Sequence, residues 1–155
     1  ANEAKEVTSL DISKQALEIA VLNGKLNRYS GSHKTIADDA FIAMKTMIKN
    51  KQTFDVVVID PPSFAKQQSE IELAKKKYAQ LAQLGAKLTT KKGLLVLASC
   101  SSRVIAQTFF DINAQALGEV RRGQECILKT YHDCDHPISF PEGAYLKCGY
   151  YRFED

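Results

Sequence analysis

The sequence lacks the long apolar runs, paired cysteines and repeats that mark membrane, disulfide-framed and repetitive proteins. No apolar run approaches the roughly 18 residues of a membrane span. The four cysteines form no CxxC pair, which is typical of reduced cytoplasmic thiols rather than of a disulfide framework. We therefore expect a soluble, cytoplasmic protein that has no membrane partner.

The composition is that of one globular domain. Of the 155 residues, 45% are hydrophobic and 25% are charged, while eight are glycine and four are proline. These proportions exclude a disordered or collagen-like chain, and the length suffices for a buried core. The formal net charge of +3 permits an acidic partner without identifying one.

Short apolar runs alternate with segments of helical periodicity. Residues 54–59 (FDVVVI) and 94–98 (LLVLA) are apolar runs of the kind found in strands that are buried on both faces of a parallel sheet. Between them, apolar residues recur every three or four positions, as in a helix packed on that sheet. The pattern predicts strands at 6–11, 33–37, 54–60, 93–99, 124–131 and 145–153, and helices at 14–26, 40–50, 69–90 and 103–117.

This alternation predicts an α/β fold with a mostly parallel sheet. The last two strands lack an intervening helix, because residues 133–143 contain two prolines and several turn formers. We therefore expect the closing strand to lie antiparallel at the edge of the sheet.

Acidic residues follow the first two predicted strands, at the end where open α/β sheets bind their ligands. Asp11 closes the first strand predicted in this chain, and an acid that closes the second strand of such a sheet commonly accepts hydrogen bonds from the ribose of NAD or S-adenosylmethionine. A helix cap or a turn is the alternative role for Asp11. Ser13 is placed to cap the helix at 14–26, and Asp38 or Asp39 to cap the next one.

The run DPPSF at 60–64 is the more specific signal. Two prolines after an acid fix the backbone, so that the Asp60 carboxylate and the neighbouring carbonyl groups project rigidly from the strand end. That arrangement suits a flat, hydrogen-bonding target such as a nucleobase. A simple turn is the alternative interpretation.

Two cysteine-containing motifs follow later strands. Cys100, between serines at a strand end, is placed where a reactive thiol would be exposed, although most free cysteines are small buried hydrophobes. On a strand, the run HDCDH at 132–136 would put His132, Cys134 and His136 on one face, as in a zinc site. No second ligand pair is visible, so we expect no metal.

Together these motifs resemble the class I S-adenosylmethionine-dependent methyltransferases, and within them the bacterial large-subunit ribosomal RNA 5-methylcytosine methyltransferase family. The matching stretches are VTSLDIS at 7–13, ADDAF at 37–41, FDVVVIDPPSFAK at 54–66, ASCSS at 98–102 and DHPISFPEGAYLKCGYYR at 135–152. The resemblance implies a Rossmann-like methyltransferase fold, a three-layer sandwich whose mostly parallel sheet ends in an antiparallel strand.

The resemblance also implies roles for individual residues. Cys100 matches the catalytic nucleophile, and Asp60 opens the motif that faces both cofactor and base. The implied S-adenosylmethionine-binding residues are Asp11, Ile12, Asp39, Ala40, Phe41, Asp60 and Pro61, and the implied substrate-binding residues are Pro61, Pro62, Ser63 and Phe64.

The implied reaction is methyl transfer to C5 of a cytosine in 23S-type ribosomal RNA, through a covalent Cys100 adduct. A thiolate is needed because C5 of a pyrimidine becomes nucleophilic only after an addition at C6. Alternatives are an amino-group methyltransferase of guanine or adenine, a 5-methyluridine enzyme, and a non-catalytic fragment. RNA is the expected partner, and a homodimer is one alternative for the assembly.

The match to the family breaks at its N-terminal side. The chain contains no GxGxxG-like string, whereas the family carries a glycine-rich loop after its first strand. Residues 1–155 therefore resemble the C-terminal part of a catalytic domain, in which a central strand is missing. We expect an upstream segment, a second copy of the chain or direct strand closure to fill that gap. Ser102 stands where many relatives carry His, so no role of that His is transferred.

Overall fold

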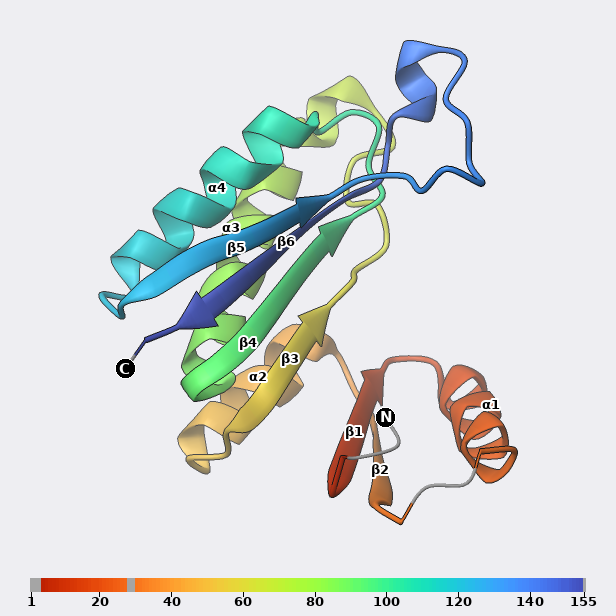
Figure 1. Ribbon diagram of the computed structural model, residues 1–155, viewed down its shortest axis with the longest axis vertical. Helices are drawn as coiled ribbons and strands as arrows, with labels where there is room; N and C mark the ends of the chain where they lie inside the picture. Colours follow the sequence, from red (N-terminus) through yellow and green to blue (C-terminus); the bar gives the residue numbers. More distant parts are fainter. Residues whose placement is uncertain (1–3, 28–29, 155) are drawn as a thin grey trace. The chain divides into compact units, whose positions relative to one another are not determined.

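The computed structural model describes residues 4–27 and 30–154 of the chain. The chain forms two compact units, Ala1–Asn50 and Lys51–Asp155, whose elements are labelled in Figure 1. That residues 1–155 form one partial catalytic domain stays a prediction.

The first unit consists of two parallel strands, each followed by a helix. Its elements in chain order are β1 (Glu6–Asp11), α1 (Lys14–Lys25), β2 (Ser32–Ala37) and α2 (Ala40–Lys49). The strands pair in register, so that Asp11 lies opposite Ala37 at their carboxyl ends.

Both helices of this unit begin at polar caps, as the sequence predicts. The Ser13 hydroxyl accepts a hydrogen bond from the Ala16 N–H at 3.2 Å, at the start of α1. The Asp39 carboxylate accepts one from the Ile42 N–H at 3.1 Å, at the start of α2. These bonds satisfy backbone donors that a helix leaves free at its first turn.

The second unit is a four-stranded mixed sheet with two long helices on one face (Figure 1). Its elements in chain order are β3 (Phe54–Ile59), η1 (Gln68–Glu70), α3 (Ile71–Leu88), β4 (Thr89–Ser99), α4 (Ala106–Glu119), β5 (Gln124–Thr130), η2 (Pro141–Gly143) and β6 (Lys147–Phe153). The strand order is β3-β4-β6-β5, with β3 and β4 parallel and β6 antiparallel to both of its neighbours.

The closing strand β6 confirms the predicted antiparallel direction but not the predicted edge position. It lies between β4 and β5, so the edge strand is β5. Burial accounts for this order: Tyr151 and Phe153 of β6 are 3% and 1% exposed, whereas Leu128 of β5 is 50% exposed. The strand with more apolar surface to bury takes the inner place.

Both long helices of this unit begin and end at residues other than those predicted. The helix predicted at 69–90 ends at Leu88, because the β-branched Thr89 already pairs with Phe54 of β3. The helix predicted at 103–117 begins only at Ala106, which leaves residues 100–105 as a loop after β4.

The core of the second unit lies between the sheet and the helices α3 and α4. Tyr78, Phe109 and Phe153 are among its buried members. On β3, Val57 and Ile59 pack against this core, whereas Val56 and Val58 are 57% and 65% exposed. β3 is thus buried on one face, whereas its apolar run predicts burial on both faces.

In the part of the chain that the structure describes, the first strand of each unit lies at the edge of its sheet and has a single strand neighbour. β1 pairs with β2, and β3 pairs with β4. What fills the predicted gap in the sheet stays a prediction. Within residues 4–27 and 30–154, no helix combines the length and the apolar character needed to cross a membrane.

Phe109 tests the packing of α4. Its side chain is 1% exposed and its ring lies 5.3 Å from that of Tyr78. Phe109→Ala should lower the free energy of unfolding by about 3–5 kcal/mol, because it removes apolar burial and leaves a cavity. Ile105→Ala, at a side chain that is 63% exposed, should change it by less than about 0.5 kcal/mol. Urea unfolding of both variants checks this, and equal effects would contradict the assigned core.

Candidate functional site

At the carboxyl ends of β1 and β2, Asp11 lies beside the turn that leads into α2. The Asp38 N–H donates to the Asp11 carbonyl at 3.2 Å. One Asp11 carboxylate oxygen, Oδ1, accepts from the Ser13 N–H at 2.7 Å. Asp11 thus stabilises a turn, which is the predicted alternative to ribose binding. Oδ2 has no hydrogen-bond partner among the residues described, and the side chain is exposed. Asp11 can therefore stabilise its turn and still accept a ligand hydroxyl.

The other predicted cofactor residues of this unit lie on the same two strand ends. Ile12 is 76% exposed, next to Asp11. Asp39 caps α2, and Ala40 and Phe41 form the first turn of that helix, where both are half-buried. An exposed aliphatic side chain beside a free carboxylate oxygen fits a nucleoside, which offers a flat apolar base and ribose hydroxyls.

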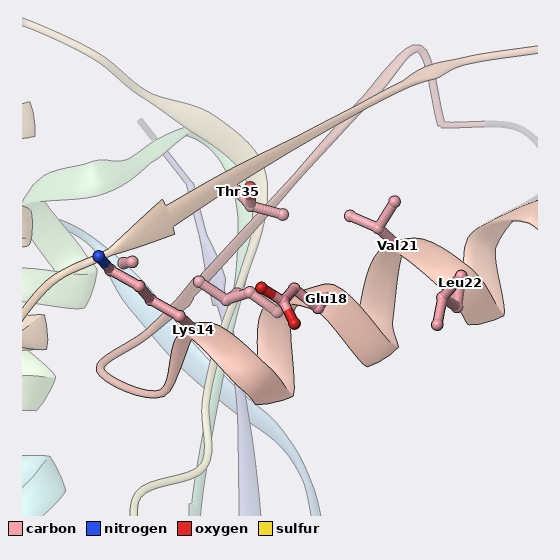
Figure 2. Close-up of a pocket in the computed structure, with 7 residues that line it drawn as sticks. Lys14, Glu18, Val21, Leu22 and Thr35 are labelled. Atoms are coloured by element: carbon pink, nitrogen blue, oxygen red, sulfur yellow. The ribbon is translucent and has the colours of Figure 1, made fainter.

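A hollow of about 450 Å³ lies elsewhere in this unit, between α1 and β2 (Figure 2). Leu17, Val21 and Leu22 of α1 supply its apolar wall, and Thr35 comes from β2. None of the predicted site residues lines this hollow. The chemistry-bearing residues at the strand ends are thus separate from this hollow.

In the second unit, parallel pairing places two strand-end loops side by side. Ile59, the last residue of β3, lies opposite Leu97 of β4. Asp60 follows β3 and is exposed, and Cys100 follows β4 and is half-buried. The Arg103 Nε donates to the Lys66 carbonyl at 3.0 Å and so joins the two loops. The structure thereby brings together the acid and the thiol that the sequence predicts as catalytic.

The loop after β3 is held by its own side chains. The Ser63 hydroxyl donates to the Ala65 carbonyl at 3.3 Å. The Phe64 ring packs edge-on against Tyr78, with 5.1 Å between ring centroids, and the Lys77 ammonium lies 5.0 Å from the Phe64 centroid. Phe64 thus anchors the loop to α3, and its predicted contact with a base stays a prediction.

Glu70 closes the C-terminal side of the same loop. Its Oε2 accepts from the Lys66 and Gln67 N–H groups at 2.7 and 2.9 Å. These backbone hydrogen bonds, from Gln67 first and Lys66 second, hold the pKa of the Glu70 carboxyl below its usual value.

The loop that carries Cys100 is held by buried hydroxyl groups. The Ser99 hydroxyl donates to the Tyr78 oxygen at 2.9 Å and accepts from the Ser101 N–H at 3.2 Å. Burial raises the pKa of Tyr78, and the nearby Cys100 and Asp60 raise it further. Tyr78 thus joins the end of β4, through Ser99, to the loop after β3, through Phe64.

Lys147 is a residue of this site that is absent from the sequence-based prediction. It lies on β6 opposite Ser99 and is 1% exposed. Its Nζ donates to the carbonyls of Ser101 and Tyr145, the latter at 3.0 Å. A signal exists in the sequence, since Lys147 shares the period of two with Tyr151 and Phe153, which face the core.

The histidine-containing run at 132–136 is a loop and not a strand, so the premise of a shared strand face is wrong. The His132 Nε2 accepts from the Leu146 N–H at 3.0 Å, and the rings of His132 and His136 stack with 6.1 Å between centroids. Across residues 4–27 and 30–154, no three His, Cys, Asp or Glu side chains are grouped to hold a metal ion.

A family model described as Conserved hypothetical protein 95 matches residues 1–122. The chain belongs to this family. A ribosomal RNA large subunit methyltransferase of Deinococcus radiodurans is 38% identical over 152 residues, which is 97% of this chain and 37% of that protein. The ribosomal RNA large subunit methyltransferase I of Cronobacter sakazakii is 34% identical over 146 residues, with coverages of 92% and 37%. The chain thus spans little more than a third of the length of these relatives.

Solved structures share the fold. A chain described as a SAM-dependent methyltransferase from Streptococcus mutans aligns with a TM-score of 0.78 at 21% identity, over 96% of this chain and 39% of its own. A second solved structure, with the same TM-score, identity and coverages, is a crystal structure of a methyltransferase complexed with SAH. The Rossmann-like α/β fold predicted from the sequence is confirmed, and the curated relatives agree with the predicted ribosomal RNA methyltransferase family.

Glu70→Gln tests how the loop after β3 is held. Because the folded-state pKa of Glu70 lies below its value in the unfolded chain, the carboxylate contributes stability above the unfolded pKa. That contribution is lost as the pH falls through the folded pKa. The wild type should therefore exceed the variant in free energy of unfolding near neutral pH, and the difference should shrink in acid. Urea unfolding over a pH series checks this, and a constant difference would contradict it.

Proposed function

We propose that the protein carrying this chain methylates C5 of a cytosine in large-subunit ribosomal RNA of the 23S type, with Cys100 as nucleophile. The observation that carries the proposal is the pairing of an acid, Asp60, and a thiol, Cys100, at the ends of adjacent parallel strands. The names of the curated relatives support ribosomal RNA as the substrate class. Such a substrate would place the protein in the cytoplasm.

The methyl donor we propose is S-adenosylmethionine. Asp11 would accept from its ribose hydroxyls through the free Oδ2, and Ile12, Asp39, Ala40 and Phe41 would surround the base. Asp60 and Pro61 are the proposed cofactor contacts of the second unit. When bound, S-adenosylmethionine supplies the activated methyl group.

Cys100 supplies the covalent chemistry. Its thiolate adds to C6 of cytosine, an S–C6 bond forms, and the displaced electron pair makes C5 nucleophilic. Once C5 carries the methyl group, a base removes the C5 proton, the S–C6 bond breaks and the thiolate is regenerated. The thiol thus divides one difficult substitution into two easier steps.

The loop at 60–64 would select and orient the base. The Asp60 carboxyl group would hold N3 of cytosine, and the Pro61 carbonyl would accept from the exocyclic amine. Pro62, Ser63 and Phe64 complete the proposed substrate contacts. A loop anchored through Phe64 and Glu70 keeps these groups in place before the base arrives, which lowers the entropy cost of binding.

Cys100→Ala in the intact natural protein tests this proposal. Methylation of ribosomal RNA should fall by at least about a thousandfold, while the dissociation constant for S-adenosylmethionine changes by less than about fivefold, because the thiol acts on the base. Product mapping of the methylated nucleoside and calorimetric cofactor titration measure the two quantities.

Cys126→Ala, at an exposed thiol on β5, is the matched control and should retain activity. Turnover close to wild type in Cys100→Ala would contradict the proposal and favour methylation of a base amino group, which needs no thiol. 5-Methyluridine as the product would retain the thiol mechanism with a different base. Absence of cofactor binding in the intact wild type would leave the non-catalytic alternative.

Asp11→Ala tests the cofactor assignment. Loss of hydrogen bonds to a charged acceptor should weaken S-adenosylmethionine binding by about 1–3 kcal/mol, or roughly 5- to 150-fold. Ser13→Ala is the control, because it disturbs the same turn and leaves the Asp11 carboxylate in place. Equal affinities of Asp11→Ala and wild type in calorimetry would show that the ribose binds elsewhere.

A further inference from the structure

Lys147 is a charged side chain in a position that normally holds an apolar one. It is 1% exposed, on the face of β6 that also carries the core residues Tyr151 and Phe153. A lysine is almost never fully buried unless its charge is paired, because removing an ammonium group from water is costly. The burial of Lys147 therefore calls for an interaction that compensates for it.

The hydrogen-bond partners of Lys147 are neutral. Its Nζ donates to the carbonyls of Ser101 and Tyr145. Within residues 4–27 and 30–154, no Asp or Glu carboxylate forms an ion pair with it. The Ser101 carbonyl that accepts from its Nζ belongs to the residue directly after Cys100. The ionisable side chain that adjoins this hydrogen-bonded carbonyl in the chain is thus the Cys100 thiol.

The contact with Ser101 also fixes the backbone at Cys100. The Ser101 side chain is fully buried, and its Oγ has no hydrogen-bond partner in the described part of the chain. Ser101 is held instead through its backbone, with its N–H bonded to Ser99 and its carbonyl bonded to Lys147. Cys100 lies in the chain between Ser99 and Ser101, so both bonds restrict the backbone beside it.

We infer that Lys147 is a positioning residue for the nucleophile: its buried ammonium group fixes the loop that carries Cys100 and stabilises the thiolate form of that side chain. The inference rests on the proposed function, in which Cys100 attacks the base. An ammonium group next to a thiolate raises the fraction of the reactive form near neutral pH, and the thiol proton passes to water.

The electrostatics of Lys147 agree with this role. Burial lowers its pKa to about 8, against a smaller opposing effect of Cys100. Below that pH the ammonium form is present, as the inference requires. The other titratable groups around this point are Tyr78 of α3, Tyr145 before β6, Asp60 after β3 and Cys148 of β6.

Alkylation of Cys100 tests the inference in the intact natural protein. Trypsin releases residues 93–103 with Cys100 as the single cysteine, so mass spectrometry can follow this thiol alone. In Lys147→Met, the rate of carbamidomethylation by iodoacetamide near pH 7 should fall about tenfold or more, and the pH midpoint of the reaction should rise by about one unit or more. Lys87→Met removes an exposed lysine at the far end of α3 and should leave both quantities unchanged.

Lys147→Gln separates charge from position. It keeps an N–H donor for the Ser101 carbonyl and lacks the charge, so its alkylation should be slow near pH 7 and recover as the pH rises. A purely structural role for Lys147 predicts that alkylation stays slower than in the wild type even at high pH, where the thiol is a thiolate in both proteins. Unchanged alkylation rates and midpoints in folded Lys147→Met and Lys147→Gln would overturn the inference.

A reciprocal measurement avoids any folding defect in the Lys147 variants. If thiolate and ammonium stabilise each other, removal of the thiol must destabilise the ammonium by the same free energy. The titration midpoint of Lys147, followed by NMR of its side chain, should therefore be lower in Cys100→Ala than in the wild type. Equal midpoints would overturn the inference.

The two proposals fail in different ways. If Cys100→Ala retains methylation while Lys147→Met still slows alkylation of Cys100, the nucleophile assignment is wrong and the coupling of the two residues stands. If Cys100→Ala is inactive, while Lys147→Met methylates RNA like the wild type and its Cys100 is alkylated at the wild-type rate, the nucleophile assignment stands and the role of Lys147 is wrong.

Discussion

Parallel pairing of β3 with β4 is the constraint on which the chemistry of the second unit depends. Parallel neighbours end at the same edge of a sheet, so the residues that follow them must share that edge. Asp60 and Cys100 both follow strands that end at this edge, although forty positions separate them in the chain. The hydrogen bond between Arg103 and Lys66 then keeps the two loops from separating.

The same edge concentrates buried polar groups, and these groups determine how firmly the site is held. Tyr78, Ser99 and Lys147 come from α3, β4 and β6, and each is at least nine-tenths buried. A polar group in such surroundings is costly unless it is hydrogen-bonded, so each bond restricts the loop that carries Cys100. The loop that carries the thiol is thus held in place because its buried polar neighbours would lose free energy of stabilisation if their hydrogen bonds were broken.

Local signals in the sequence sufficed for the features that depend on nearby residues. Ser13 and Asp39 cap their helices as predicted, because capping involves bonds over three positions. Features set by distant partners could not be predicted in this way. The inner position of β6 depends on pairing across the sheet, and Phe64 serves as an anchor only because α3 places Tyr78 beneath it. Lys147 escapes prediction because a buried lysine contradicts the average preference of its residue type.

The covalent step is the central claim, and trapping it is the most direct test. Large-subunit ribosomal RNA transcribed with 5-fluorocytidine would be incubated with the intact natural protein and S-adenosylmethionine. Fluorine at C5 cannot leave as a proton does, so the S–C6 bond cannot break after methyl transfer. We predict a stable protein–RNA complex whose link maps to residues 93–103, at Cys100. Methylation of unmodified RNA without any such complex would contradict the account.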